Sequence, residues 1–105
     1  MRTVNFRRFL TDDDFIRVSF VTDKGKIQEF VIQLESRLGD DWHPIVRYDC
    51  AHGFAHRDLL RPRKSAEKKL LEETDLNRAL TFAQKDITTN WQTYRRRFEK
   101  WLNEK

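Results

Sequence analysis

Side chains that could do chemistry are concentrated in one twelve-residue stretch, residues 47–58. The stretch reads RYDCAHGFAHRD and contains two aspartates, two histidines and two arginines. A histidine oriented by a carboxylate can move protons near neutral pH, and an arginine beside it can hold an anionic group such as a phosphate. This stretch is therefore the first candidate for a catalytic centre.

A strand–turn–strand arrangement is predicted for this stretch, with His52-Gly53 as a two-residue turn. The turn fixes the register and pairs Asp49 with His56 and Arg47 with Asp58. Directly opposed side chains in an antiparallel pair have Cβ atoms about 4.5–5.5 Å apart. We therefore expect the two pairs to lie side by side on one face of the sheet.

These pairs suggest a ribonuclease-like hypothesis, in which the chain is RNA-directed. His56 would move protons, Asp49 would orient it, Arg47 would bind the scissile phosphate, and His52 would be a second acid or base, with Asp58 on the same face. The alternative is structural, because opposite charges across strands also stabilise an ordinary exposed sheet face. In that case the chain is a non-enzymatic interaction or homodimer module.

Metal and thiol chemistry are weaker alternatives. His52, His56 and Asp58 have the even spacing that places side chains on one face of a strand, as the ligands of one metal ion would be. No second His/Cys cluster supplies the remaining ligands, however. We therefore predict no metal and no cofactor. Cys50 falls on the opposite face of its strand, so we predict a buried and inert thiol.

Basic residues are dense just after this stretch. We predict that they bind nucleic acid, since the chain has a net charge of +4 and clustered cations attract phosphate backbones. The predicted binding residues are Arg57, Arg61, Arg63, Lys64, Lys68 and Lys69. A run of charges is also what an ordinary solvated face contains.

The composition indicates one small domain. A chain of 105 residues with 38% apolar residues can close one hydrophobic core but not two. A single cysteine fits a reducing compartment, and no apolar run is long enough for a membrane span or a signal peptide. We therefore expect a cytoplasmic protein with no membrane partner.

The pattern of elements predicts an α+β fold in which an antiparallel four-stranded sheet packs against one long C-terminal amphipathic helix. The predicted parts are an N-terminal segment (1–14), the sheet (15–60), a charged linker (61–74) and the helix (75–102). In the first hairpin, a three-residue loop that includes Gly25 would set Val18 opposite Phe30. That register turns six apolar side chains toward the core: Ile16, Val18, Phe20, Phe30, Ile32 and Leu34.

The helix is predicted from its apolar periodicity. Apolar residues recur at steps of three and four and make one stripe, which we expect to cover the sheet. The stripe consists of Leu76, Leu80, Ala83, Ile87, Trp91, Tyr94, Phe98 and Trp101. Thr74 or Asp75 is the expected N-cap.

The sheet face away from the helix also carries apolar residues in this register. They are Phe15, Val21, Ile27, Val31, Ile45, Phe54 and Leu60. A bare apolar face is uncommon in a monomer. We expect it to be covered by the N-terminal Phe6, Phe9 and Leu10 or by a partner, most simply a second copy of the chain.

Two motifs carry a resemblance to known proteins. The first is R-Y-D-x-A-H-G-x-x-H-x-D, and the second is N-x-A-L-x-x-A-x-x-D-I-x-x-N-W-x-x-Y-x-x-x-F. Together they resemble an uncharacterised family of small prokaryotic proteins over about Val46 to Phe98. More distantly, R-Y-D-x-A-H is similar to TumE-type toxins of toxin–antitoxin pairs. That resemblance implies a toxin component with Arg47, Asp49, His52 and His56 as the matching positions.

Overall fold

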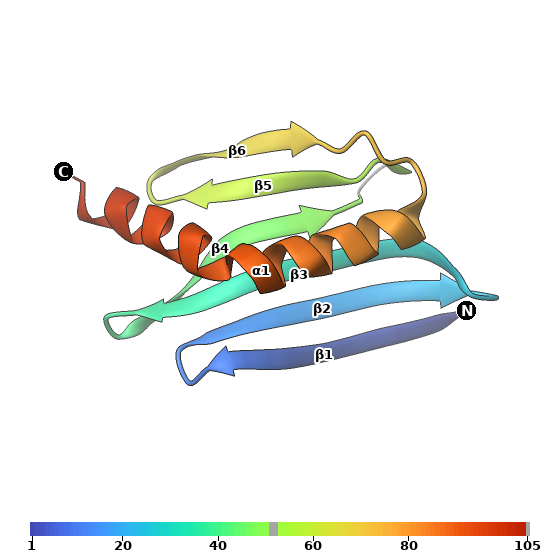
Figure 1. Ribbon diagram of the computed structural model, residues 1–105, viewed down its shortest axis with the longest axis horizontal. Coiled ribbons are helices and arrows are strands. Elements are labelled where there is room, and N and C mark those ends of the chain that lie inside the picture. The colour runs from blue at the N-terminus through green and yellow to red at the C-terminus, as the bar shows by residue number, and fades with distance from the viewer. Residues whose placement is uncertain (51–52, 105) are drawn as a thin grey trace.

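The computed structural model describes residues 1–50 and 53–104. It has six strands followed by one helix, in the order β1 (Arg2–Thr11), β2 (Asp14–Asp23), β3 (Lys26–Leu38), β4 (Asp41–Asp49), β5 (His56–Arg61), β6 (Lys64–Leu70) and α1 (Leu76–Asn103). The strands form one antiparallel sheet in chain order, β1 to β6 (Figure 1). The α+β class and the single C-terminal helix are as the sequence predicts, but the prediction of four strands is wrong.

The two strands that the sequence did not predict are the edges of the sheet. The segment 1–14 is mostly β1, and the expected linker 61–74 contains β6, which pairs with β5 after a turn at Pro62-Arg63. No residue of either strand is fully buried. Both strands therefore form through backbone pairing, while their side chains stay largely in solvent and leave no clear apolar alternation in the sequence.

The predicted register of the β2–β3 hairpin is also wrong, although the predicted core face is right. Val18 lies opposite Ile32 rather than Phe30. The turn is the two-residue Lys24-Gly25, in which both residues have positive φ, and the register then shifts between Val21 and Thr22. With regular pairing, a two-residue turn would set apolar side chains of one strand opposite polar side chains of the other. The irregularity restores the pairing of apolar with apolar side chains.

The β4–β5 register follows the prediction. Arg47 lies opposite Asp58, and Asp49 lies opposite His56. The predicted two-residue turn is His52-Gly53, of which His52 lies outside the described residues; Gly53 to Ala55 precede β5 and are not part of a strand.

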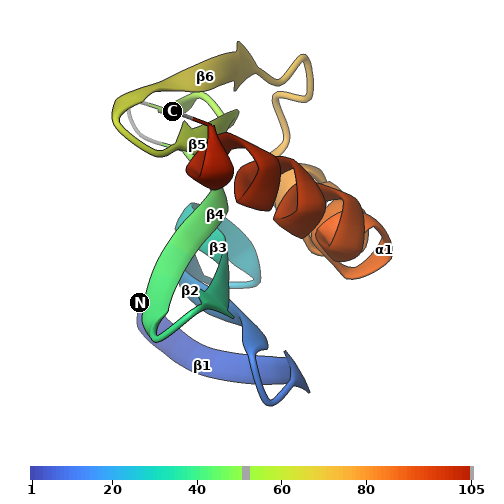
Figure 2. The same cartoon turned by 90° about the vertical axis from the view of Figure 1, so that its left-hand side faces the viewer.

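The helix packs across the middle of the sheet. Asp75 is its N-cap and accepts a hydrogen bond from the backbone N–H of Arg78. The helix lies mainly against β3, β4 and β5, while β1 and β2 lie on the far side of the sheet from β6 (Figure 2). The core between them is formed by apolar side chains from both layers: Ile16, Val18, Phe30, Ile32, Leu34, Val46, Leu59, Leu80, Ile87 and Phe98. Phe20, which we expected in this core, is only partly buried.

A buried carboxylate connects the helix to the first half of the sheet. Asp14 is completely buried and accepts hydrogen bonds from the hydroxyls of Thr11 and Ser36, each at 2.6 Å. Arg95 of α1 donates to the same carboxylate at 3.0 Å. The Asp14–Arg95 ion pair therefore joins residues that are 81 positions apart.

A second polar contact connects the helix to β4. The hydroxyls of Tyr48 and Tyr94 both donate to Oδ2 of Asp86, at 2.6 and 2.5 Å, and Asn90 donates to Oδ1 at 2.7 Å. Burial, followed by the hydrogen bond to Asp86, raises the pKa of both tyrosines. The tyrosines therefore stay protonated donors at neutral pH.

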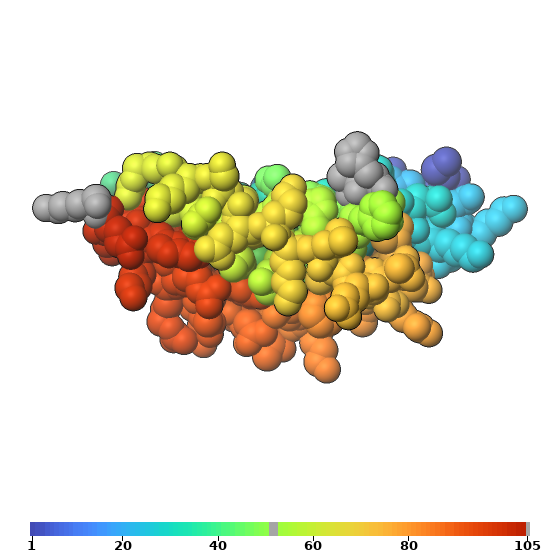
Figure 3. Space-filling model, turned by 90° about the horizontal axis from the view of Figure 1, so that it is seen from above, coloured from blue at the N-terminus to red at the C-terminus, as the bar shows by residue number. Residues whose placement is uncertain are grey.

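The β5–β6 hairpin lies beside the helix when the molecule is viewed from the β6 edge (Figure 3). Arg63, at the hairpin turn, donates to the backbone carbonyl of Glu104 just after the helix, at 2.8 Å. In residues 1–50 and 53–104, no helix is sufficiently long and apolar to traverse a lipid bilayer.

Candidate functional site

The face of the sheet opposite the helix carries the predicted catalytic residues. Side chains alternate between the two faces of a strand. Tyr48 of β4 is buried and contacts Asp86 of the helix, so its neighbours Arg47 and Asp49 belong to the opposite face. We call this opposite side of the sheet the open face.

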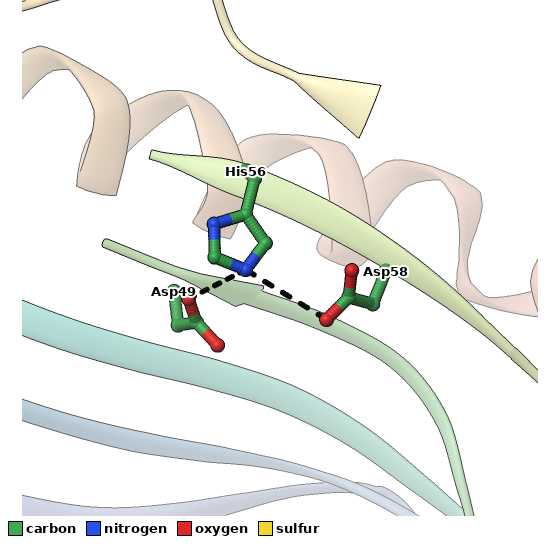
Figure 4. Close-up of side chains that lie close together, drawn as sticks. All are labelled: Asp49, His56 and Asp58. Carbon is green, nitrogen blue, oxygen red and sulfur yellow. Dashed lines mark ion pairs between the residues drawn. The ribbon is translucent and has the colours of Figure 1, made fainter. Parts of the chain in front are cut away.

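Three side chains converge on the open face. Nε2 of His56 lies 2.8 Å from Oδ1 of Asp49 and 3.8 Å from Oδ2 of Asp58 (Figure 4). The side chains of His56 and Asp58 are 12% and 11% exposed, and that of Asp49 is 21% exposed. The three groups are thus mostly withdrawn from water, which strengthens the electrostatic interactions among them.

The geometry gives the two ring nitrogens of His56 different roles. At 2.8 Å, an Nε2–H can donate to Asp49, which fixes the ring orientation and the tautomer. Nδ1 lies on the opposite side of the ring from Asp58, and neither contact drawn in Figure 4 reaches it. Nδ1 is therefore the ring nitrogen that these two carboxylate contacts do not use.

The same three residues could hold a metal ion. One ligand atom from each of Asp49, His56 and Asp58 lies within 4.8 Å of the others. A histidine nitrogen and two carboxylate oxygens suit a divalent cation such as Mn²⁺ or Zn²⁺. This set differs from the one considered from the sequence, because it uses Asp49 and does not depend on His52.

Arg47 is on the open face but does not form the expected ion pair. Its Nε donates to the side-chain oxygen of Gln33 on β3, at 2.7 Å. Within residues 1–50 and 53–104, no carboxylate lies within ion-pair distance of Arg47. Its charge is thus not neutralised by Asp58, although the two residues are opposite each other in the register.

Asp58 instead faces a lysine from the strand that the sequence did not predict. Nζ of Lys68 on β6 lies 3.8 Å from Oδ1 of Asp58, and that oxygen is buried without a hydrogen bond among the described residues. Lys68 is 64% exposed along its side chain. It is the member of the predicted basic set that comes closest to the three converging side chains.

The structure does not bring the predicted basic residues together into one surface. Arg57 faces the helix, where its guanidinium contacts the hydroxyl of Tyr94 at 3.4 Å. Arg61 donates to the backbone carbonyl of Ser65, and Arg63 donates to Glu104. Lys64 and Lys69 are exposed on β6. The predicted role of His52 falls outside the described residues.

A hollow of about 270 Å³ lies beside Asp49. Its lining includes Ser19, Val21 and Val31 as well as Asp49 and Cys50. Burial raises the pKa of the Cys50 thiol, whose sulfur accepts a hydrogen bond from the backbone N–H of Phe30. Cys50 is therefore a buried thiol, and the hollow offers room for a substrate group next to the Asp49–His56 contact.

Sequence reasoning expected Phe9 to cover the face that carries Phe15, but it missed the aromatic cluster that these two rings form with Trp42 at the other end of the open face. Phe15 lies between Phe9 and Trp42, with ring centroids 5.2 and 5.1 Å away. The three rings come from β1, β2 and β4, and β1 was not predicted. No spacing within one strand could have revealed the cluster, because it depends on the pairing of separate strands.

The family model for a domain of unknown function, DUF7718, matches residues 1–104. The chain belongs to the DUF7718 family. No curated protein matches this DUF7718 chain, and no solved structure matches it. The open-face geometry is therefore the basis on which its function can be argued.

Proposed function

We propose that the chain is an RNA-directed protein that cleaves single-stranded RNA, with His56 as the acid–base group. The observation that carries this proposal is the 2.8 Å contact between Nε2 of His56 and Asp49, formed across two strands on a solvent-facing sheet face. A carboxylate that fixes one imidazole nitrogen leaves the other nitrogen poised for proton transfer.

The proposed reaction uses the 2′-hydroxyl of RNA as the nucleophile. Nδ1 of His56 takes the 2′-hydroxyl proton, and the 2′-oxygen attacks the adjacent phosphorus. The bond from phosphorus to the 5′-oxygen breaks, and that oxygen takes a proton from the solvent. The products are a 2′,3′-cyclic phosphate and a 5′-hydroxyl, and no redox partner or metal is required.

Charges around His56 support binding of a phosphate group. Arg47 is oriented by Gln33 and has no carboxylate partner among the described residues, so its terminal N–H groups can donate to the scissile phosphate. Lys68 partly offsets the charge of Asp58. The hollow beside Asp49 gives space for an adjoining base.

The likeness of residues 47–52 to TumE-type toxins belongs to the same proposal. RNA cleavage would make the chain the toxin component of a toxin–antitoxin pair. The competing function is a non-enzymatic interaction module, in which the open face binds a protein or a second copy of the chain.

The test is incubation of the purified chain with labelled single-stranded RNA, with EDTA and without. We expect cleavage that survives EDTA, and a loss of about 100-fold or more in His56→Ala, which is typical of removing a general base. Asp49→Asn should also lose activity, because an amide nitrogen can face Nε2 and no longer fixes the ring. Asp40→Asn is the matched control, since Asp40 is exposed in the turn between β3 and β4.

Other outcomes would assign a different function. Intact RNA with every variant, from folded protein, would leave the interaction module as the function. Cleavage abolished by EDTA and restored by Mn²⁺ would make Asp49, His56 and Asp58 metal ligands and would refute His56 as the base.

A further inference from the structure

We propose that the aromatic cluster of Phe9, Phe15 and Trp42, with three surrounding arginines, binds unpaired bases of single-stranded RNA. This inference deepens the proposed function and rests on it for the choice of RNA, but it concerns a separate binding site. The site lies on the open face, where rings from β1, β2 and β4 meet.

The outer rings of the cluster are accessible. Phe9 is 56% exposed and Trp42 is 42% exposed, while Phe15 between them is 4% exposed. The buried ring supports the two outer rings and holds them apart in fixed positions. Exposed rings on a rigid sheet are what unstacked bases need, since base–aromatic stacking is tolerant of sequence.

Three arginines surround these rings. The guanidinium carbons of Arg7 and Arg17 lie 5.5 and 5.4 Å from the ring centroid of Phe15, and that of Arg37 lies 5.8 Å from the ring centroid of Trp42. Guanidinium planes beside aromatic rings can stack on bases and donate to phosphates.

One of the three arginines beside the rings has no ion-pair partner among the described residues. Arg17 pairs with Glu35 through its Nε at 2.8 Å, and Arg37 pairs with Asp13. Arg7 forms no ion pair among the described residues, so its guanidinium can donate to a phosphate. An apolar protein surface would fit the rings but would leave Arg7 without an anionic partner, whereas single-stranded RNA supplies both bases and phosphates.

The aromatic cluster and His56 lie on the same face of the sheet. On β3, Val31, Gln33 and Glu35 alternate with buried residues and therefore share the open face. Val31 lies opposite Asp49 of β4, and Gln33 lies opposite Arg47 of β4. Glu35 lies opposite Phe15 of β2. Along β4, Trp42 and Asp49 are seven residues apart, or about 23 Å at about 3.3 Å per residue. One RNA strand of about seven stacked nucleotides, at about 3.4 Å each, spans that distance.

The test measures binding without cleavage. The probe is a fluorescein-labelled 12-nucleotide RNA with 2′-O-methyl groups, which cannot react through a 2′-hydroxyl, and the readout is fluorescence anisotropy. Phe9→Ala and Trp42→Ala should each weaken binding about 5- to 100-fold, the range found for loss of one base–aromatic stack. Phe15 is left intact because it is buried.

The two changes on β1 have controls on the opposite face of the same strand. Phe6 is 45% exposed and pairs with the core residue Val18, so Phe6→Ala removes an exposed ring from β1 without touching the cluster. Arg7→Gln should lower the slope of log Kd against log salt by about 0.7, the value for one phosphate contact on a single strand. Arg8→Gln, which loses a hydrogen bond to Thr88 on the helix side, should leave that slope unchanged.

The outcomes separate this inference from the proposed cleavage. Binding by His56→Ala equal to wild type supports the inference even if no RNA is ever cleaved. Equal losses in Phe6→Ala and Phe9→Ala, or no binding of the probe by wild type at 50 mM salt, would overturn it. A wild-type dimer that Trp42→Ala converts to a monomer, with no oligonucleotide binding, would also overturn it by making the cluster a protein interface.

Discussion

Arg95 offers the sharpest test of how the helix is held on the sheet, through the change Arg95→Met. Methionine keeps most of the aliphatic length of the side chain but removes the charge and the donors. The change would leave Asp14 completely buried, with only the hydroxyls of Thr11 and Ser36 as hydrogen-bond donors.

The expected loss of stability follows from this burial. Removing one partner of a buried ion pair costs about 3–5 kcal/mol. The side chain of Arg95 is 27% exposed, and Asp14 keeps two hydroxyl donors, so we expect a loss nearer about 2–3 kcal/mol. At about 4–8 °C per kcal/mol for a domain of this size, Tm should fall by about 10–20 °C.

The assay is urea unfolding followed by circular dichroism, with thermal unfolding as a second measurement. Arg96→Met is the matched control, because Arg96 is the exposed neighbour and should change stability by less than about 0.5 kcal/mol. Equal effects of the two substitutions would refute the reasoning, since they would mean that Asp14 does not depend on the guanidinium. Adding Asp14→Asn to Arg95→Met should recover part of the loss, because it removes the uncompensated charge.

Three further predictions concern titration, the thiol and the first turn. The pKa values of Tyr48 and Tyr94 are raised in the folded state, so the stability that these tyrosines contribute is complete below about pH 10, where an unfolded tyrosine titrates. That stability is lost as the pH rises above this value. Urea unfolding at pH 8 and pH 11 measures the loss of unfolding free energy, which Tyr48→Phe should reduce. Cys50 should not react with a thiol reagent at pH 8 until the chain is unfolded, because it is 5% exposed and its pKa is raised by burial; rapid stoichiometric labelling of folded protein would contradict this. Gly25→Ala should cost about 1–2 kcal/mol in urea unfolding, because φ is +80° there although nothing obstructs a Cβ; a neutral effect would show that the turn relaxes.

Sequence reasoning was most accurate where one side of an element is buried. The stripe that includes Leu80, Ile87 and Phe98 correctly predicts the helix and its packed face. The β4–β5 register is also correctly predicted, and it places Asp49 opposite His56. The helix stripe reflects the requirement to bury apolar side chains, whereas the β4–β5 register was predicted from a two-residue turn at His52-Gly53.

Prediction failed where stability comes from backbone pairing or from irregular geometry. The sequence KSAEKKL of β6 has no buried side chain, so its charges indicate a loop rather than an edge strand. The irregularity beside Thr22 shifts the β2–β3 register, and no single residue in the sequence indicates it.

The candidate site was predicted only in part, for the same reasons. Arg47 bonds to Gln33 on β3 rather than pairing with Asp58, because a long side chain can reach a strand other than the one considered. The contact between Lys68 and Asp58 requires β6, which was not predicted.

The order of strands in the sheet has a consequence for how the chain folds. Every strand pairs with its neighbour in sequence, so the sheet can form by successive closure of short hairpins. Chains dominated by local contacts fold faster than those that must first close long loops. The step that joins distant parts of the chain is docking of the helix, where Arg95 meets Asp14 across 81 residues. We therefore expect the hairpins to form early and helix docking to limit the rate, so that Arg95→Met slows the final folding step.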